Sequence, residues 1–186
     1  MTTPAGLMNM EAARAAFYYT ATKLVFGTTN KPYEAVTQPV RQLSAMNVYF
    51  KTRNEVDQAL QDRFVADTDP YRRVQIMAEK AEKYGFGNCE EQSSVAYMYL
   101  SKLGKYTIDW CRWKIGYHAF VIVGRPAGRY DIAKIPTAPW FKDAVICDPQ
   151  DKRLGYWADL VTDYPVSNII PMLHQEPGKI REWVNL

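Results

Sequence analysis

The feature that most constrains the fold of this 186-residue chain is a change of hydrophobic pattern near its middle. Up to residue 84, apolar residues recur at helical spacing in runs at 10–25, 33–49, 54–65 and 71–84. From residue 105 onward the pattern is typical of strands, with apolar runs at about 106–113, 117–124 and 143–148. Helices followed by consecutive strands predict an α+β fold, in which a helical N-terminal half accompanies a small antiparallel sheet.

No internal repeat or low-complexity linker divides the chain, so a single domain spanning 1–186 is expected. Within it we expect a helical N-terminal lobe at about 1–84, a core at about 85–165 and a C-terminal segment at about 166–186. A chain of this length, with 47% hydrophobic residues, can bury a sizeable core. The N-terminal lobe either packs behind the core or binds a target protein or chaperone.

A helix is predicted from Cys89 to Leu103. Asn88 is a favourable N-cap, and Glu91 stands three residues later, as in a capping box. Gly104 is a typical residue for the C-terminal end of a helix. This assignment makes Cys89 the first residue of the helix.

A thiol at the start of a helix is a good position for nucleophilic chemistry. An ordinary cysteine has a pKa near 8.5, so only a few per cent is thiolate at neutral pH. The helix N-terminus favours the thiolate of Cys89, whereas the negative charges of Glu90 and Glu91 oppose it. A cationic partner for Cys89 is therefore expected.

Two residues at strand ends complete a predicted Cys-His-Asp triad. Because side chains alternate along a strand, His118, Phe120 and Ile122 share one face. If the helix that begins with Cys89 packs on that face, His118 lies close to the thiol and acts as its base. Asp148 closes the next apolar run, and an antiparallel neighbour would bring its carboxylate beside the imidazole to orient it.

Three short segments resemble the papain-like and transglutaminase-like cysteine enzymes, especially the bacterial toxins and effectors of that superfamily. They are the helix start 87–90, the strand 117–121 and the strand 145–149, and the resemblance covers about residues 84–151. It implies a papain-like core with Cys89 as nucleophile, His118 as general base and Asp148 as orienting acid. It also implies an acyl-thioester intermediate on a protein substrate, leading to peptide hydrolysis, deamidation or transglutamination, with no cofactor.

One departure from the papain-like proteases concerns the oxyanion hole. Those enzymes carry a glutamine a few residues before the nucleophile, and residues 83–88 of this chain contain none. The backbone N–H of Cys89 and a second donor would have to replace it, and Asn88, Gln92 and Tyr117 are the candidates. This difference favours the transglutaminase-like or effector branch.

A long connection at 125–142 is interpreted as either a lid or a surface excursion. Trp140 and Trp157 flank the predicted site and are expected to line a substrate groove, although aromatic residues also fill cores. Arg125 lies in the same connection and is expected to face solvent or an acidic partner.

The remaining cysteines and the second histidine receive structural assignments. Cys111 and Cys147 lie in apolar runs and are expected to be core residues. His174 lies in a Pro-bounded segment and is expected at the surface. The three cysteines have no paired spacing of a disulfide framework or zinc site, so no metal site is predicted.

The net charge and the hydropathy of the chain limit which partners and locations are expected for it. A net charge of +3 does not favour nucleic acid as a partner, and no apolar run is long enough to span a membrane. Without a recognisable signal peptide, the protein is expected to be cytoplasmic or secreted by a signal-less bacterial route, with a chaperone or immunity protein as a further partner. Two alternatives remain: a non-catalytic protein-binding module with the same fold, and a small-molecule acyltransferase of the arylamine N-acetyltransferase kind.

Overall fold

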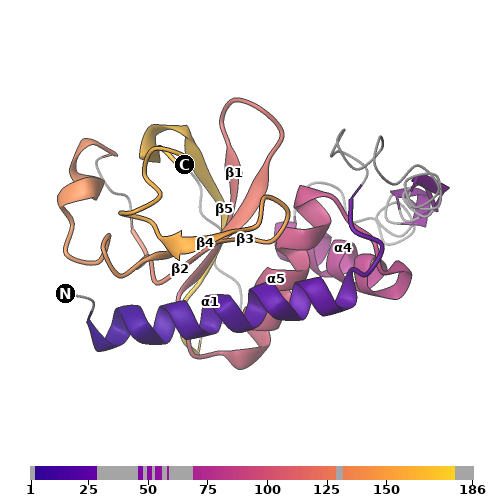
Figure 1. Cartoon of the computed structure of the whole chain (residues 1–186), viewed down its shortest axis with the longest axis horizontal. Helices are drawn as coiled ribbons and strands as arrows, with labels where there is room; N and C mark the ends of the chain where they lie inside the picture. Colours follow the sequence, from indigo (N-terminus) through magenta and orange to yellow (C-terminus); the bar gives the residue numbers. More distant parts are fainter. Residues whose placement is uncertain are drawn as a thin grey trace.

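A computed structural model describes residues 3–28, 46–47, 50–51, 53–55, 58, 69–128 and 132–178. Its helices are α1 (Pro4–Lys23), α4 (Pro70–Tyr84) and α5 (Cys89–Leu103), with 3₁₀ helices η1 (Ile132–Thr137) and η2 (Val166–Asn168). Its strands are β1 (Ile108–Trp113), β2 (Ala119–Val123), β3 (Val145–Asp148), β4 (Arg153–Tyr156) and β5 (Ile169–Gln175). The mixture of helices and one sheet confirms the α+β class (Figure 1). The helix predicted at 33–49, and most of that at 54–65, lie outside the described residues.

The sheet has five strands in the order β4-β3-β2-β1-β5, and every neighbouring pair is antiparallel. β1, β2 and β3 correspond to the predicted apolar runs, whereas β4 and β5 were not predicted. β5 lies at the edge and contains Pro171, which pairs with Cys111 beside an irregularity in the register. An edge strand tolerates proline because the missing N–H faces no further partner.

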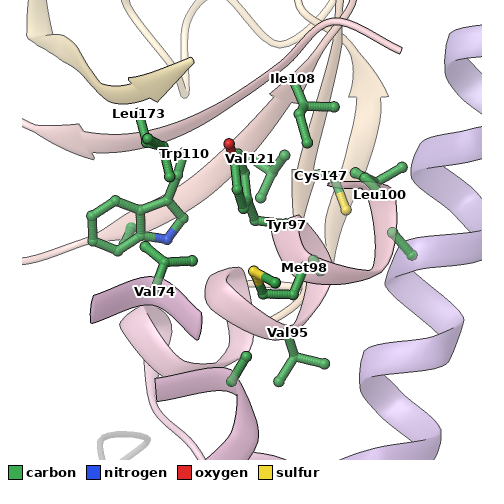
Figure 2. Close-up of a cluster of buried hydrophobic side chains, with 14 of the residues drawn as sticks. Val74, Val95, Tyr97, Met98, Leu100, Ile108, Trp110, Val121, Cys147 and Leu173 are labelled. Atoms are coloured by element: carbon green, nitrogen blue, oxygen red, sulfur yellow. The ribbon is translucent and has the colours of Figure 1, made fainter. Parts of the chain in front are cut away.

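Both faces of the sheet are covered by apolar groups. Helices α1, α4 and α5 cover one face (Figure 1), forming what we call the helix-side core. Figure 2 shows Trp110, Val121 and Leu173 of the sheet gathered with side chains of α5, including Tyr97 and Met98. The other face carries a second core. Its largest side chains are Phe120, Ile122, Phe141, Trp157 and Tyr164.

The helix beginning with Cys89 packs on the face opposite to the predicted one. Ala119, Val121 and Val123 belong to the helix-side core, whereas Phe120 and Ile122, which share parity with His118, belong to the second core. The prediction of the face was therefore wrong. Every residue of β2 is buried, so both faces are equally apolar and alternation alone could not show which one the helix covers.

His174 and Arg125 also differ from their predictions, because both are buried. His174 lies in β5 with 1% of its surface exposed, and its Nδ1 is 2.8 Å from Asp109 Oδ1. The Arg125 guanidinium donates to both carboxylate oxygens of Asp109, at 2.8 and 2.6 Å. The three side chains form one buried charge network, and pairing of this kind is what makes the burial of charge tolerable.

Cys111 and Cys147 are fully buried, which confirms that they are core residues. Within the described ranges, no helix combines the length and apolar character needed to cross a bilayer.

Candidate active site

The first turn of α5 is fixed by several contacts around Cys89. Asn88 and Glu91 form the predicted capping box, and the Glu91 carboxylate accepts the Asn88 backbone N–H at 3.0 Å. The Gln92 side-chain amide donates to Gly87 O at 2.7 Å, and Thr28 donates to Asn88 Oδ1 at 2.6 Å. These bonds hold the chain that leads into the helix and so set the position of the thiol.

Gly87 is required at this entry because the chain passes close to the helix. A Cβ placed on Gly87 would lie 2.5 Å from the Glu91 Cβ, well inside normal contact. A larger residue would push the segment before Cys89 away from α5 and disturb the capping box.

The structure brings Cys89, His118 and Asp148 together. His118 Nε2 is hydrogen-bonded to Asp148 Oδ2, and Cys89 lies close enough to the imidazole to influence its pKa. The thiol also lies 3.5 Å from the carbonyl oxygen of Tyr117. Because His118 Nε2 bonds the Asp148 carboxylate, Nδ1 is the ring nitrogen that remains to interact with the Cys89 sulfur. Cys89 is 7% exposed and Asp148 is fully buried, so the contacts lie beneath the surface but are not sealed from it.

The thiol and the imidazole come from opposite faces of the sheet. Cys89 belongs to the helix-side core, whereas His118 stacks on Phe120 of the second core, with ring centroids 6.0 Å apart. They meet because His118 directly precedes β2, at the end of the sheet where α5 begins. The predicted juxtaposition therefore arises through a different packing from the predicted one.

His118 is strongly biased towards its protonated form. Burial by itself lowers the pKa of His118, but the hydrogen bond to Asp148, the nearby Cys89 thiol and the charges of Asp148 and Asp151 outweigh it. The balance raises the pKa of His118 to about 10. The ring is therefore an imidazolium at neutral pH, and loses its proton only as the pH rises through about 10.

The carboxylate of Asp148 is held by groups that sequence patterns did not reveal. Tyr164 donates its hydroxyl to Asp148 Oδ2 at 2.6 Å, and the Asp151 backbone N–H donates to Oδ1 at 3.1 Å. Burial and the charge of Asp148 raise the pKa of Tyr164, which therefore remains a donor at all ordinary pH values. These bonds fix the orientation in which Asp148 meets His118.

Replacement Tyr164→Phe is expected to lower the free energy of unfolding by about 1.5–3 kcal/mol, because a buried carboxylate loses a hydrogen bond. Urea denaturation measures the effect. Tyr156→Phe is a matched control, since its hydroxyl donates to Gly6 O at 3.4 Å, and less than about 1 kcal/mol is expected there. Equal losses in the two variants would contradict a special role for the Tyr164 hydroxyl.

Trp113 covers the imidazole. Its ring centroid is 4.7 Å from that of His118, and its backbone N–H donates to His118 O at 3.1 Å across the β1–β2 hairpin. An aromatic wall at this position restricts the rotation of His118 and limits water around the ring. The prediction did not include Trp113, although strand alternation across a hairpin could have placed it beside His118.

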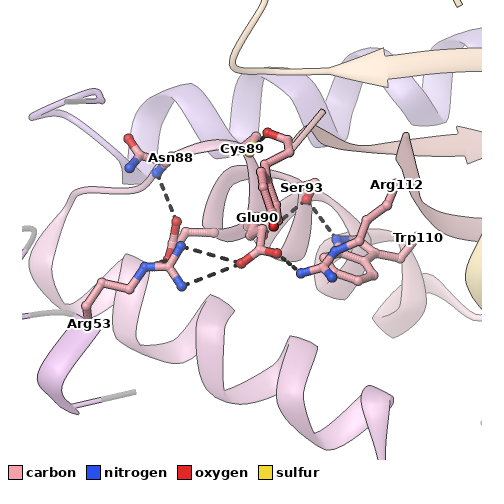
Figure 3. Close-up of polar contacts among 9 residues, drawn as sticks. Arg53, Asn88, Cys89, Glu90, Ser93, Trp110 and Arg112 are labelled. Atoms are coloured by element: carbon pink, nitrogen blue, oxygen red, sulfur yellow. Dashed lines mark hydrogen bonds and ion pairs between the residues drawn. The ribbon is translucent and has the colours of Figure 1, made fainter. Parts of the chain in front are cut away.

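The glutamates that follow Cys89 are neutralised by arginines (Figure 3). Arg112 of β1 forms an ion pair with Glu90, and Arg53 contacts Glu90 Oε2 at 3.4 Å and Glu91 Oε1 at 3.0 Å. Desolvation and the neighbouring charges of Arg73 and Arg53 lower the pKa of Arg112, while Cys89 acts in the opposite direction. Arg112 is thus a second cation close enough to interact with the thiol, and it was not predicted.

Two of the three proposed oxyanion donors are already engaged in the local structure. Asn88 participates in the capping box and accepts from Thr28, and Gln92 uses an amide hydrogen on Gly87 O. Tyr117 instead places its side chain in solvent, with 99% of it exposed.

The predicted groove residues Trp140 and Trp157 belong to the second core. Trp157 is 2% exposed and donates from Nε1 to Tyr164 O at 2.9 Å, so it cannot line an open groove. Trp140 packs against it, with ring centroids 6.2 Å apart. The expectation was wrong for Trp157 because its indole fills space between the sheet and the 3₁₀ segments.

A hollow of about 260 Å³ opens beside His118 instead. It lies at the end of the β1–β2 hairpin, on the side of α5 that carries Glu90. Besides His118 it is lined by Glu90, Arg112, Trp113, Lys114, Gly116 and Tyr117.

Among the described residues, one group of side chains has the spacing of metal ligands: His118, Asp148 and Asp151, whose ligand atoms lie within 4.8 Å of one another. The fit to an ion is poor. His118 Nε2 and Asp148 Oδ2 contact each other directly, and both Asp148 oxygens already accept protein hydrogen bonds. The arrangement is that of a hydrogen-bonded pair.

No protein-family model, curated protein or solved structure matches this chain.

Proposed function

We propose that this protein is a cysteine-dependent acyl-transfer enzyme of the papain-like or transglutaminase-like kind, acting on carboxamide or peptide bonds of proteins. Cys89 is the nucleophile, His118 the general acid and base, and Asp148 the residue that orients His118. The observation that carries the proposal is the position of the imidazole, which is hydrogen-bonded to a buried carboxylate and lies close enough to the Cys89 thiol for the two groups to interact.

In the first half of the reaction, the Cys89 sulfur attacks the carbonyl carbon of the substrate. The imidazolium of His118 and the N-terminus of α5 stabilise the thiolate that makes this attack. As the tetrahedral intermediate collapses, His118 gives its proton to the departing nitrogen, and ammonia or an amine leaves. The product is a thioester on Cys89 and a neutral His118.

In the second half, water or an amine replaces the sulfur. Neutral His118 removes a proton from the incoming group, which attacks the thioester carbonyl, and Cys89 leaves as the thiolate. Asp148 stabilises the imidazolium that this step regenerates. The backbone N–H of Cys89 lies in the first turn of α5, where N–H groups lack intrahelical partners, and is placed to bind the oxyanion.

Alkylation by iodoacetamide tests whether His118 activates Cys89. An ordinary thiol is roughly 3% ionised at pH 7, so full ionisation could accelerate labelling at most about 30-fold. Because thiolates of low basicity are weaker nucleophiles, we expect Cys89 in the wild type to react about 3- to 30-fold faster than in His118→Gln. The advantage should vanish above about pH 10, where His118 has lost its proton. Peptide mass mapping over time measures the rates.

Cys111 and Cys147 serve as internal controls in the same experiment. Burial raises the pKa of both thiols, so both should label slowly in either variant. Equal labelling of Cys89 at pH 7 in the wild type and in His118→Gln would contradict the proposed activation, whatever the exposure of the sulfur.

A further inference from the structure

We infer that the hollow beside His118 and the hairpin tip at 114–117 form the docking site for an acidic, partly apolar segment of a polypeptide substrate. The inference rests on the proposed function, and it specifies the class of substrate that the same site takes. Three properties support it: the position of the hollow, its charge and the exposure of its rim.

The hollow adjoins the reacting groups. His118 forms part of its wall, and Arg112, another wall residue, is close enough to Cys89 for the two charges to interact. A group bound there would therefore lie beside the carbonyl that Cys89 attacks. At about 260 Å³ the hollow is smaller than a typical enclosed ligand pocket of roughly 300–1,000 Å³, which favours one side chain of a larger partner.

One positive charge in the lining of the hollow is available to a partner, that of Lys114. Arg112 of its lining is paired with Glu90, and His118 is paired with Asp148, so neither adds free positive charge. Both oxygens of Glu90 are already paired, Oε1 with Arg112 and Oε2 with Arg53. Lys114 is exposed and has no acidic partner within the described part of the chain. A substrate carboxylate bound here could therefore pair with Lys114.

The rim exposes large apolar groups on a fixed loop. Ile115 is 81% exposed and Tyr117 is 99% exposed. The loop is held by Asn168, which accepts from Lys114 N at 2.8 Å and from Ile115 N at 3.2 Å. Apolar side chains carried on a backbone that is already held are suited to the centre of a protein contact, because docking does not first have to order the loop.

Alkylation by two reagents of different charge tests the electrostatic part. Iodoacetate is an anion and iodoacetamide is its neutral analogue, so the ratio of their rates at Cys89 reports the local potential. We expect Lys114→Glu to lower this ratio about fivefold at low ionic strength, and high salt to reduce the difference. Lys105→Glu makes the same charge change at the other end of β1. This variant should keep the ratio of rates within about twofold of the wild-type ratio.

The outcomes separate the two proposals. If Cys89 resists both reagents, the proposed function fails. If Cys89 reacts readily but Lys114→Glu and Lys105→Glu give equal ratios, the proposed function stands and the docking inference is overturned.

Peptide binding tests the substrate class directly. With Cys89→Ala protein, which binds without turnover, fluorescence anisotropy compares labelled Leu-Glu-Glu-Gln-Leu with Leu-Lys-Lys-Gln-Leu. We expect the acidic peptide to bind at least about fivefold more tightly, and Lys114→Glu to remove that preference. The double variant Ile115→Ala, Tyr117→Ala should weaken the binding of both peptides. Equal binding of the two peptides, or unchanged binding by the double variant, would overturn the inference.

Discussion

Replacement Cys89→Ala is expected to abolish substrate modification, with a rate loss of about 10⁴-fold or more, because no other group can form the thioester. The fold should survive, since the side chain contributes little volume to the helix-side core. Incubation of the wild type and the variant with a cell extract, followed by mass spectrometry, would detect deamidated, cleaved or crosslinked peptides. These three products also distinguish water from an amine as the second substrate.

The control for this prediction is Cys147→Ala. Cys147 is a buried cysteine of the same core on β3, and its thiol lies 3.5 Å from Ala13 O. The variant should retain activity at a modest cost in stability. Full activity of the Cys89→Ala variant would refute the proposed mechanism, whatever the activity of the Cys147→Ala variant.

Replacement Asp109→Ala is expected to lower the free energy of unfolding by about 3–5 kcal/mol, the largest stability effect that we predict. Asp109 is fully buried and accepts hydrogen bonds from Arg125 and His174, which are also buried. Without it, the arginine keeps its charge in a site from which water is excluded. Urea denaturation measures the change, and domains of this size have a total stability of only about 5–15 kcal/mol.

Two comparisons isolate the cause of the loss. Asp159→Ala removes an exposed carboxylate and should change stability by less than about 0.5 kcal/mol. The triple variant Asp109→Leu, Arg125→Met, His174→Leu removes the whole network and should recover most of the stability. If the triple variant is no more stable than Asp109→Ala, packing rather than unpaired charge explains the loss.

Helix ends were the most predictable part of the fold because their signals are local. Asn88, Glu91 and Gly104 correctly marked both ends of α5. Local signals also stand at the start of α4, where Pro70 is the first helical residue and the Asp69 carboxylate accepts the Arg72 N–H at 3.2 Å. Such contacts span three or four residues, so they depend little on the rest of the chain.

The edges of the sheet were not predictable in the same way. β5 contains Pro171, which ordinarily argues against a strand, and its partner β1 lies about 60 residues earlier. Its assignment as a surface segment led directly to the wrong position for His174. β4 is only four residues long and contains Gly155, so it lacks the alternating pattern that identifies a strand.

The sequence indicated the three candidate residues of the site, but not the side chains that surround them. The helix start at Cys89 and the strand ends at His118 and Asp148 were visible as local patterns. Tyr164 and Arg112 were not, because each reaches the site through tertiary packing. Arg112 shares strand parity with Trp110 and so faces the helices, a signal that could have placed it near α5.

The meeting of sulfur and imidazole across the end of the sheet ties chemical reactivity to completed folding. One partner is anchored by the layer of helices and the other by the aromatic layer behind the strands. Under the proposed function, a chain in which only one layer has condensed would lack the pairing of Cys89 with His118, so nucleophilic attack would require both layers to be folded.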